Sequence, residues 1–197
     1  MRTNKTISLD RLTEEVDQRS KKHALLLIGI DGCGGAGKST LARNLAKNFT
    51  DCTIVHMDDF YHPSEKIIKA DPALKPIGAD FDWERLKNHL LLPLTQWQDG
   101  SYQRYDWDTD KMAEWHTVPA TGIVVIEGVY STRKELFGFY DLTIWVNTPR
   151  ETRLARGLAR DGEGARSIWE GNWMVSEELY VKKQQPDQRV NFIVDGT

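Results

Sequence analysis

The sequence contains few cysteines, no long apolar run and no signal-like N-terminus. Its two cysteines, Cys33 and Cys52, are too few for a disulfide framework and have no metal-ligand spacing. The longest apolar stretch, ALLLIGI at 24–30, is far shorter than the roughly 18 residues that a membrane span requires. The opening residues, MRTNKTISLDRLTEEVDQRSKKH, are charged throughout and lack the apolar centre of a signal peptide. We therefore expect a cytoplasmic protein that does not contact a membrane.

An excess of positive charge is also absent. The 26 lysines and arginines stand against 29 aspartates and glutamates, which gives a net charge of -3. A surface that coats nucleic acid needs a basic excess or a basic stripe, so we expect no nucleic-acid partner. At 197 residues the chain is long enough to bury its own core, and we expect residues 1–197 to form a single domain. The oligomeric state stays open, a homo-oligomer included.

Short apolar runs alternate with helical patterns along the chain. Five runs are typical of buried parallel strands, and they lie at 24–30, 52–57, 122–128, 141–147 and 190–196. Ser8 is placed to cap a helix that buries Leu12 and Val16, and WERLKNHLLLPL at 83–94 predicts another helix. This order predicts an α/β fold in which a five-stranded parallel sheet has helices on both faces.

The stretch GCGGAGKST at 32–40 follows the first strand and opens a helix. It fits the dinucleotide pattern G-x-G-x-x-G and also the P-loop pattern G-x-x-x-x-G-K-[ST]. Asp58 and Asp59, about twenty positions on, keep the dinucleotide interpretation open. Only the P-loop explains Lys38 and Ser39, because a lysine there bridges the β- and γ-phosphates and a hydroxyl ligates magnesium. We predict that ATP and Mg²⁺ bind here, through Gly32, Gly34, Gly35, Ala36, Gly37, Lys38, Ser39 and Thr40.

The segment TPRETRLARGLARDG at 148–162 predicts a helix with an arginine-rich face. Thr148 and Glu151 have the spacing of a capping box, and Arg153, Arg156 and Arg160 share one face. Such a face is often simply solvated. In a phosphoryl-transfer enzyme it also suits a lid whose arginines neutralise the moving phosphoryl group, and we assign this role to about 150–168, with Arg156 and Arg160 as catalytic residues. Three glycines supply hinge candidates: Gly157, Gly162 and Gly164.

Two carboxylates follow predicted strands. Glu127 ends the run at 122–128 and is a candidate magnesium ligand, the alternative being a polar strand terminus. Asp58 follows the strand at 52–57, so a doubly wound sheet brings it beside the phosphates. We predict that Asp58 accepts a proton from the substrate hydroxyl, with Asp59 as the alternative base.

Two polar segments, 58–82 and 98–118, interrupt the pattern and are predicted to bind the acceptor. The second is expected to form a small hairpin or the base of a lid. Tyr61, Asp82, Tyr105 and Asp106 are the predicted substrate-binding residues, since an aromatic ring can stack on a base or sugar and a carboxylate can bond sugar hydroxyls. The alternatives are a core role for the rings and solvent exposure for the acids.

Together these pieces resemble the uridine kinase and phosphoribulokinase family of P-loop kinases. The matching stretches are GCGGAGKST, DDFY, FDWERL, RYDWD, IEG and TRLARGLARD, which lie between about 24 and 195. The resemblance implies that Asp58 is the catalytic base, that Glu127 supports magnesium and that Arg156 and Arg160 contact phosphates. FDWERL departs from the FDHPDAF-like stretch of uridine kinases, and Gly157 stands where many relatives have another arginine. The resemblance therefore implies kinase chemistry but not uridine itself.

We predict an ATP-dependent kinase that phosphorylates a hydroxyl of a small metabolite, with a nucleoside as the favoured acceptor. Its catalytic residues are Lys38, Asp58, Arg156 and Arg160. Two alternatives stay open, a nicotinamide-dependent oxidoreductase and a non-catalytic ATP-binding switch. A GTPase switch is disfavoured because no N-K-x-D motif follows the P-loop.

Overall fold

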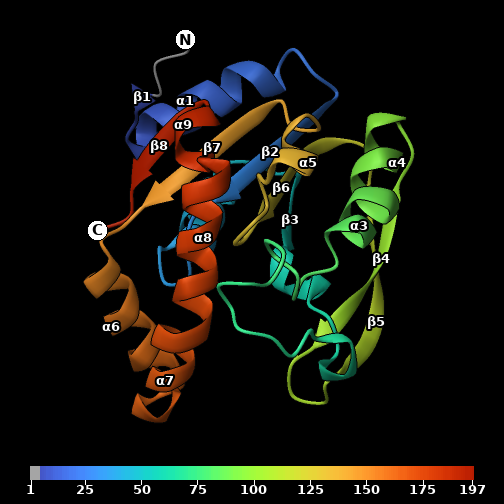
Figure 1. The fold of residues 1–197 in the computed structure, drawn as a ribbon. Helices are drawn as coiled ribbons and strands as arrows, with labels where there is room; N and C mark the ends of the chain where they lie inside the picture. Colours follow the sequence, from blue (N-terminus) through green and yellow to red (C-terminus); the bar gives the residue numbers. More distant parts are fainter. Residues whose placement is uncertain (1–4) are drawn as a thin grey trace.

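The computed structural model describes residues 5–197, which form a six-stranded parallel sheet and the helices around it (Figure 1). The strand order is β1-β8-β7-β2-β6-β3. The strands are β1 (Lys5–Thr6), β2 (Leu25–Asp31), β3 (Cys52–His56), β6 (Gly122–Glu127), β7 (Leu142–Asn147) and β8 (Phe192–Asp195). The α/β fold and its five predicted strands are confirmed. The sixth strand, β1, is only two residues long and extends the sheet beside β8, where Thr6 pairs with Ile193.

The helices include all three that were predicted in the first half of the chain. They are α1 (Leu9–Ser20), α2 (Lys38–Ala46), α3 (Trp83–Leu86), α4 (Leu92–Thr95), α5 (Lys134–Phe137), α6 (Arg150–Asp161), α7 (Arg166–Ile168), α8 (Met174–Gln184) and α9 (Pro186–Arg189). A π-helical turn at 87–91 joins α3 to α4, so the predicted helix at 83–94 is continuous. A second π-helical turn at 169–173 joins α7 to α8.

The first helix forms as its sequence predicts. The hydroxyl oxygen of Ser8 accepts a hydrogen bond from the Arg11 amide at 3.4 Å, which caps α1. Leu12 and Val16 lie one turn apart and are fully buried. Propensity, cap and apolar spacing agree here, so a local pattern was sufficient to find the helix.

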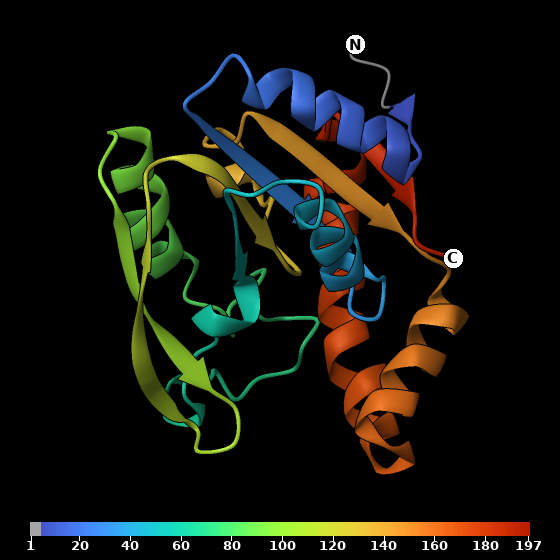
Figure 2. The same cartoon turned by 180° about the vertical axis from the view of Figure 1, so that it is seen from behind.

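Helices cover both faces of the sheet (Figures 1 and 2). Leu26 and Ile28 of β2 pack with α1 and α2 in one core, whereas Leu25 and Leu27 face a second core that contains α3, α4 and α5. This alternation follows from the two-residue period of a strand. Figure 2 shows α1 and α2 in front of the sheet, and Figure 1 shows α8 on the opposite side.

The predicted hairpin is present, and one long helix was missed. β4 (Gly100–Asp106) and β5 (Lys111–Val118) pair antiparallel and pack on the second core through Tyr102 and Val118. The continuous helix at 166–184 had not been predicted from the sequence. Its buried positions include polar Glu177 and Gln184 beside Met174 and Tyr180, so no clean apolar stripe marks it.

The loops that carry the candidate site leave the sheet at one edge. In the register of the strands, Glu127 of β6 pairs with Ile30 of β2 and with His56 of β3. The glycine-rich loop, Asp58 and Glu127 therefore come together at the carboxyl ends of adjacent parallel strands. In open α/β sheets this is where ligands bind.

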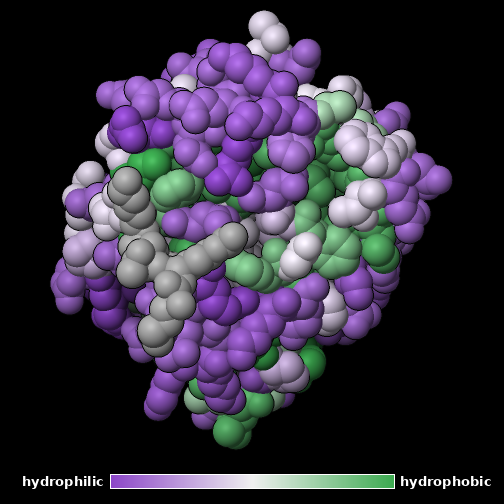
Figure 3. All heavy atoms as spheres, turned by 90° about the horizontal axis from the view of Figure 1, so that it is seen from above, coloured by the Kyte–Doolittle hydropathy of each residue, from purple (hydrophilic) through white to green (hydrophobic). Residues whose placement is uncertain are grey.

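The surface on the α1 side is mostly hydrophilic, with hydrophobic residues gathered toward the side of α4 and α5 (Figure 3). Arg11, Glu14 and Gln18 are the exposed residues of the middle of α1. Within residues 5–197, no helix combines the length and the apolar character that a membrane crossing demands.

Candidate active site

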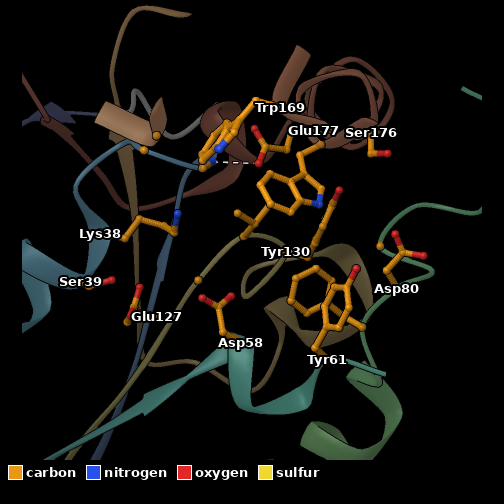
Figure 4. A pocket seen from close by; sticks show the side chains of 18 of the residues that line it. Lys38, Ser39, Asp58, Tyr61, Asp80, Glu127, Tyr130, Trp169, Ser176 and Glu177 are labelled. Carbon is orange, nitrogen blue, oxygen red and sulfur yellow. Dashed lines mark hydrogen bonds between the residues drawn. The ribbon is translucent and has the colours of Figure 1, made fainter. Parts of the chain in front are cut away.

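A cavity of about 740 Å³ lies at the carboxyl edge of the sheet (Figure 4). Its walls come from the glycine-rich loop with the start of α2, from the irregular segment after β3, from the turn after β6, and from α6 and α8. Lys38 and Ser39 lie at one end in Figure 4, and Tyr61 and Asp80 lie toward the other.

The glycine-rich loop turns sharply because two of its glycines have left-handed backbone angles. The angle φ is +74° at Gly35 and +99° at Gly37, and a Cβ at Gly35 would stand 2.4 Å from the carbonyl oxygen of Arg153. Glycine alone adopts such angles at little cost. α2 begins at Lys38, whose Nζ donates to the Cys33 carbonyl at 3.0 Å. A helix N-terminus beside a lysine is a favourable site for a polyphosphate.

A buried carboxylate that no sequence motif marks supports this loop. The Gly34 amide donates to Oε1 of Glu177 at 2.9 Å, the bond dashed in Figure 4, and Nη1 of Arg153 lies 3.1 Å from Oε2. Burial raises the pKa of Glu177, while the Gly34 amide, Lys38 and Arg153 oppose the shift. Glu177 therefore links α8 and α6 to the phosphate-binding loop.

Cys33 has no reactive character. Its side chain is buried in a cluster with Tyr130 and Tyr180. Burial, followed by the charge of Glu177, raises the pKa of the Cys33 thiol to about 12. Because the thiolate is the reactive form, this cysteine is a packing residue at neutral pH.

The two predicted magnesium ligands lie at the phosphate end. Ser39 and Glu127 both line the cavity, and Nδ1 of His56 lies 2.5 Å from Oε1 of Glu127. Burial opposes ionisation of Glu127, but the bond with His56 and the charge of Lys38 outweigh it and hold the pKa of Glu127 below its usual range. The glutamate is therefore anionic at neutral pH.

These donors fit Mg²⁺ held together with a nucleotide. In the described part of the chain, no cluster of three or more histidine, cysteine or acidic side chains forms a ready metal site. Magnesium is commonly bound by one or two protein ligands together with phosphate oxygens and water. The hydroxyl of Ser39 and the carboxylate of Glu127 supply hard oxygen ligands of this kind.

Asp58 and Asp59 follow β3 in a 3-10 turn and point to different places. Asp58 lines the cavity. Asp59 faces the hairpin, where its Oδ2 accepts a hydrogen bond from the Tyr102 hydroxyl at 2.8 Å. Only Asp58 is therefore accessible to a molecule in the cavity.

The environment of Asp58 favours a proton acceptor. Asp58 is an exposed residue that lines the cavity, and the protein atoms around it partly desolvate its carboxyl group. This partial desolvation raises the pKa of Asp58, and the charge of Glu127 raises it further, against the opposing charges of Lys38, His56 and Arg160. A base becomes more effective as its pKa approaches the working pH.

Of the four arginines of α6, the three that were predicted to share one face have two different roles. Arg156 and Arg160 line the cavity, whereas Arg153 is buried against the glycine-rich loop. Nη1 of Arg156 donates to the Gly196 carbonyl at 2.7 Å, and Arg160 forms two bonds to Asp161 at 2.7 and 3.0 Å. Arg156 and Arg160 are therefore the arginines that a bound phosphate could contact.

Two local predictions for α6 are wrong. Thr148 and Glu151 do not form a capping box, because α6 begins at Arg150 without a side-chain cap and the Thr148 hydroxyl donates to the Ala36 carbonyl at 2.9 Å. Gly157 is not a hinge, because it lies inside the helix, where a Cβ would stand 2.5 Å from the Trp169 indole. Thr148 instead bonds to the glycine-rich loop, and Gly157 allows Trp169 to pack closely against α6.

Of the predicted acceptor residues, Tyr61 lines the cavity. Asp82 does not, because it caps α3, accepting from the Arg85 amide at 3.0 Å. Tyr105 packs behind Tyr61 with ring centroids 5.6 Å apart, and its hydroxyl donates to Asp110 at 2.7 Å. The polar groups of Asp82 and Tyr105 are thus engaged within the protein.

Asp106 is also engaged elsewhere. It shapes the hairpin turn by accepting from the amides of Asp108 and Thr109 at 2.9 and 3.3 Å. The hairpin contributes Trp107 to the cavity instead, with its ring centroid 4.4 Å from that of Tyr61.

Several residues that line the cavity had not been predicted individually. They are Lys75, Asp80, Phe81, Tyr130 and Trp173. Three of them belong to the segment 58–82, which the sequence marked only as a whole. Tyr130 follows the IEG motif by two residues, which was a usable signal, whereas Trp173 comes from the helix that was missed.

Residues 27–168 match the model of the phosphoribulokinase and uridine kinase family. Among curated proteins, the chain is 27% identical over 179 residues to a uridine kinase of Clostridium tetani, a match that covers 86% of this chain and 85% of that protein. It is 30% identical over 142 residues to a uridine kinase of Clostridium novyi, covering 69% of this chain and 68% of that protein.

Solved structures share the fold. A protein from Bacillus stearothermophilus described as a possible uridine kinase superimposes with a TM-score of 0.70 at 23% identity, covering 94% of this chain and 100% of that one. A protein from Silicibacter sp. TM1040 described as a candidate fructose transport system kinase gives 0.77 at 20% identity, covering 95% and 98%. The two descriptions differ in the acceptor, so the shared fold does not identify it.

Proposed function

The chain belongs to the phosphoribulokinase and uridine kinase family, and on this premise we propose that it transfers the γ-phosphoryl group of ATP to a hydroxyl group of a nucleoside. One observation carries the proposal. Asp58 shares a single cavity with Lys38 and Ser39, and the far end of this cavity is lined by aromatic rings. A donor site, a base and a surface for a planar acceptor are thus present in one space.

The glycine-rich loop binds the triphosphate in this proposal. Backbone amides of residues 32–40 and Nζ of Lys38 neutralise the β- and γ-phosphates. Ser39 and Glu127 hold Mg²⁺, which supplies positive charge to the phosphate oxygens when bound. His56 bonds to Glu127 and fixes the orientation of its carboxylate.

Asp58 acts as the general base. Its carboxylate accepts the proton of the acceptor hydroxyl as that oxygen attacks the γ-phosphorus, and ADP leaves from the opposite side. Asp59 is unsuited to this role because its carboxylate bonds to Tyr102.

Arg156 and Arg160 stabilise the charge on the transferred phosphoryl group. Both belong to the proposed lid at about 150–168 and both line the cavity. Their present partners are the Gly196 carbonyl and the Asp161 carboxylate, contacts that a phosphate could replace. Arg153 is excluded from this role because it is buried with Glu177.

The acceptor end suits a nucleoside, which offers both a base and a sugar to aromatic rings. Tyr61 and Trp107 supply rings on which a planar base can stack. We therefore propose these side chains for the acceptor in place of Asp82, Tyr105 and Asp106. The segments 58–82 and 98–118 keep their proposed part in acceptor binding, within a single cytoplasmic kinase domain.

The test is ADP release with Mg-ATP against a panel of nucleosides, sugars and cofactor precursors. We expect one nucleoside to give the highest rate. Lys38→Met should abolish turnover, whereas Lys47→Met, at an exposed position just after α2, should leave it unchanged. Turnover that survives Lys38→Met would refute the assignment of Lys38.

The same protein separates the two alternatives. An oxidoreductase would be stabilised against heat by a nicotinamide cofactor rather than by ATP, since a ligand that binds only the native state raises the melting temperature. A non-catalytic switch would be stabilised by ATP but would release no ADP with any acceptor.

A further inference from the structure

The acceptor end of the cavity contains a buried ion pair for which phosphoryl transfer has no need. Nζ of Lys75 lies 2.9 Å from Oδ1 and 3.2 Å from Oδ2 of Asp80, and the two side chains are 7% and 14% exposed. Both residues line the cavity. Figure 4 shows Asp80 on the far side of Tyr61 from Asp58 and Lys38. The pair therefore lies remote from the phosphate end.

Stability does not explain why this pair is present. Lysine is almost never buried unless it is paired. The desolvation of two charges often costs more free energy than their mutual attraction contributes. Apolar residues of similar volume are commonly as stable or more stable in such a place. A chain that needed only to close the segment at 71–80 could use apolar side chains there.

The pair keeps unused bonding capacity toward the cavity. A lysine ammonium has three N–H donors and an aspartate carboxylate has about four acceptor positions. Within residues 5–197, Lys75 and Asp80 make no side-chain hydrogen bond except to each other. A donor and an acceptor thus stand side by side for a molecule in the cavity.

The backbone holds Asp80 firmly beside the segment that carries Asp58. The His62 amide donates to the Asp80 carbonyl at 2.9 Å, and Tyr61 and Phe81 form an antiparallel bridge. Gly78, with φ at +63°, makes the turn that brings the segment against Tyr130, where a Cβ would stand 3.2 Å from the ring. The polar pair and the aromatic rings are therefore preorganised as one surface.

We infer that Lys75 and Asp80 determine specificity by binding the polar edge of a planar ring stacked on Tyr61 or Trp107. Lys75 donates to a ring carbonyl or ring nitrogen, and Asp80 accepts from a neighbouring N–H or amino group. Nucleobases carry such adjacent donors and acceptors, whereas a simple sugar has no planar edge. The inference rests on the proposed function, because it takes the acceptor to be a nucleoside.

The test compares steady-state kinetics of the wild type with those of Lys75→Met/Asp80→Leu. Loss of hydrogen bonds to charged groups should raise the KM for the nucleoside about 10- to 100-fold. The KM for ATP should stay unchanged, and the melting temperature should stay the same or rise. The wild type should also discriminate against a nucleoside methylated at the ring N–H, such as 3-methyluridine if uridine is the acceptor, and the double variant should lose this discrimination.

Two further variants keep the result interpretable. Lys69→Met, at an exposed position in the same segment, should behave as the wild type. Asp80→Asn keeps the size of the side chain and an amide oxygen that can accept from Lys75, and it gives the same readout if the double variant does not fold. An unchanged KM for the nucleoside in a folded double variant or in Asp80→Asn would overturn the inference while leaving the proposed function intact. A wild type that phosphorylates no nucleoside would overturn both.

Discussion

Gly157→Ala should weaken the fold although alanine is the better helix former. The added Cβ would stand 2.5 Å from Cε2 and Cζ2 of Trp169, about 0.9 Å short of the 3.4 Å at which ordinary contact begins. Overpacking of this kind costs about 1–3 kcal/mol. The higher helix propensity of alanine offsets about 1 kcal/mol of this cost, so the net loss of folding free energy is up to about 2 kcal/mol. For a chain of this length that corresponds to a fall in Tm of up to roughly 8 °C.

The same substitution should also affect ATP binding. The Trp169 indole contacts the glycine-rich loop, since a Cβ at Gly34 would stand 3.1 Å from the ring, and its Nε1 donates to Asp161 at 2.9 Å. An indole displaced by Gly157→Ala cannot keep both contacts, so we expect a higher KM for ATP.

The matched control is Gly171→Ala. Gly171 lies in the same helical region as Trp169, but a Cβ there meets no atom within 4 Å. This variant should be as stable as the wild type or more stable by up to about 1 kcal/mol. Thermal melting and the KM for ATP are measured for both variants. Equal stability of Gly157→Ala and Gly171→Ala would refute the packing argument.

Other predictions concern single side chains. Asp58→Asn should lower kcat about 10²- to 10⁴-fold, whereas Asp59→Asn should retain most activity; equal losses would contradict the assignment of the base. Because only the deprotonated carboxylate accepts a proton and the pKa of Asp58 is raised, kcat/KM should fall as the pH drops through that raised value, and a flat acid limb would count against it. With pKa values of about 12 for Cys33 and about 11 for Cys52, neither thiol should react with a disulfide reagent in the native protein at pH 8; fast labelling before unfolding would contradict the burial. Arg153→Met leaves a buried glutamate without its cation and should cost about 3–5 kcal/mol in urea unfolding, and a loss below 1 kcal/mol would show the pair to be dispensable.

The fold was predictable because its signals are local. Ser8, Leu12 and Val16 specify α1 within one short stretch, and each strand of the main sheet except β1 is a compact apolar run. Parallel strands then bring their carboxyl ends to one edge, so the neighbourhood of Lys38 and Glu127 followed from topology.

Other parts of the site depend on contacts between distant segments. Glu177 meets Gly34 across 143 positions, and no motif announces such a bond. Thr148 matched a capping box, yet its hydroxyl bonds to the Ala36 carbonyl, a competitor supplied only by tertiary packing. Asp82 and Asp80 look equally suitable in the sequence, but Asp82 caps α3, whereas Asp80 lines the cavity.

The most direct test of the account is to follow the transferred group itself. The protein is supplied with Mg-ATP labelled with ¹⁸O in the γ-phosphoryl group and with the best nucleoside, and the products are measured by mass spectrometry. The account predicts a nucleoside monophosphate that carries the label in an amount equal to the ADP formed. Labelled inorganic phosphate without a phosphorylated nucleoside would contradict it.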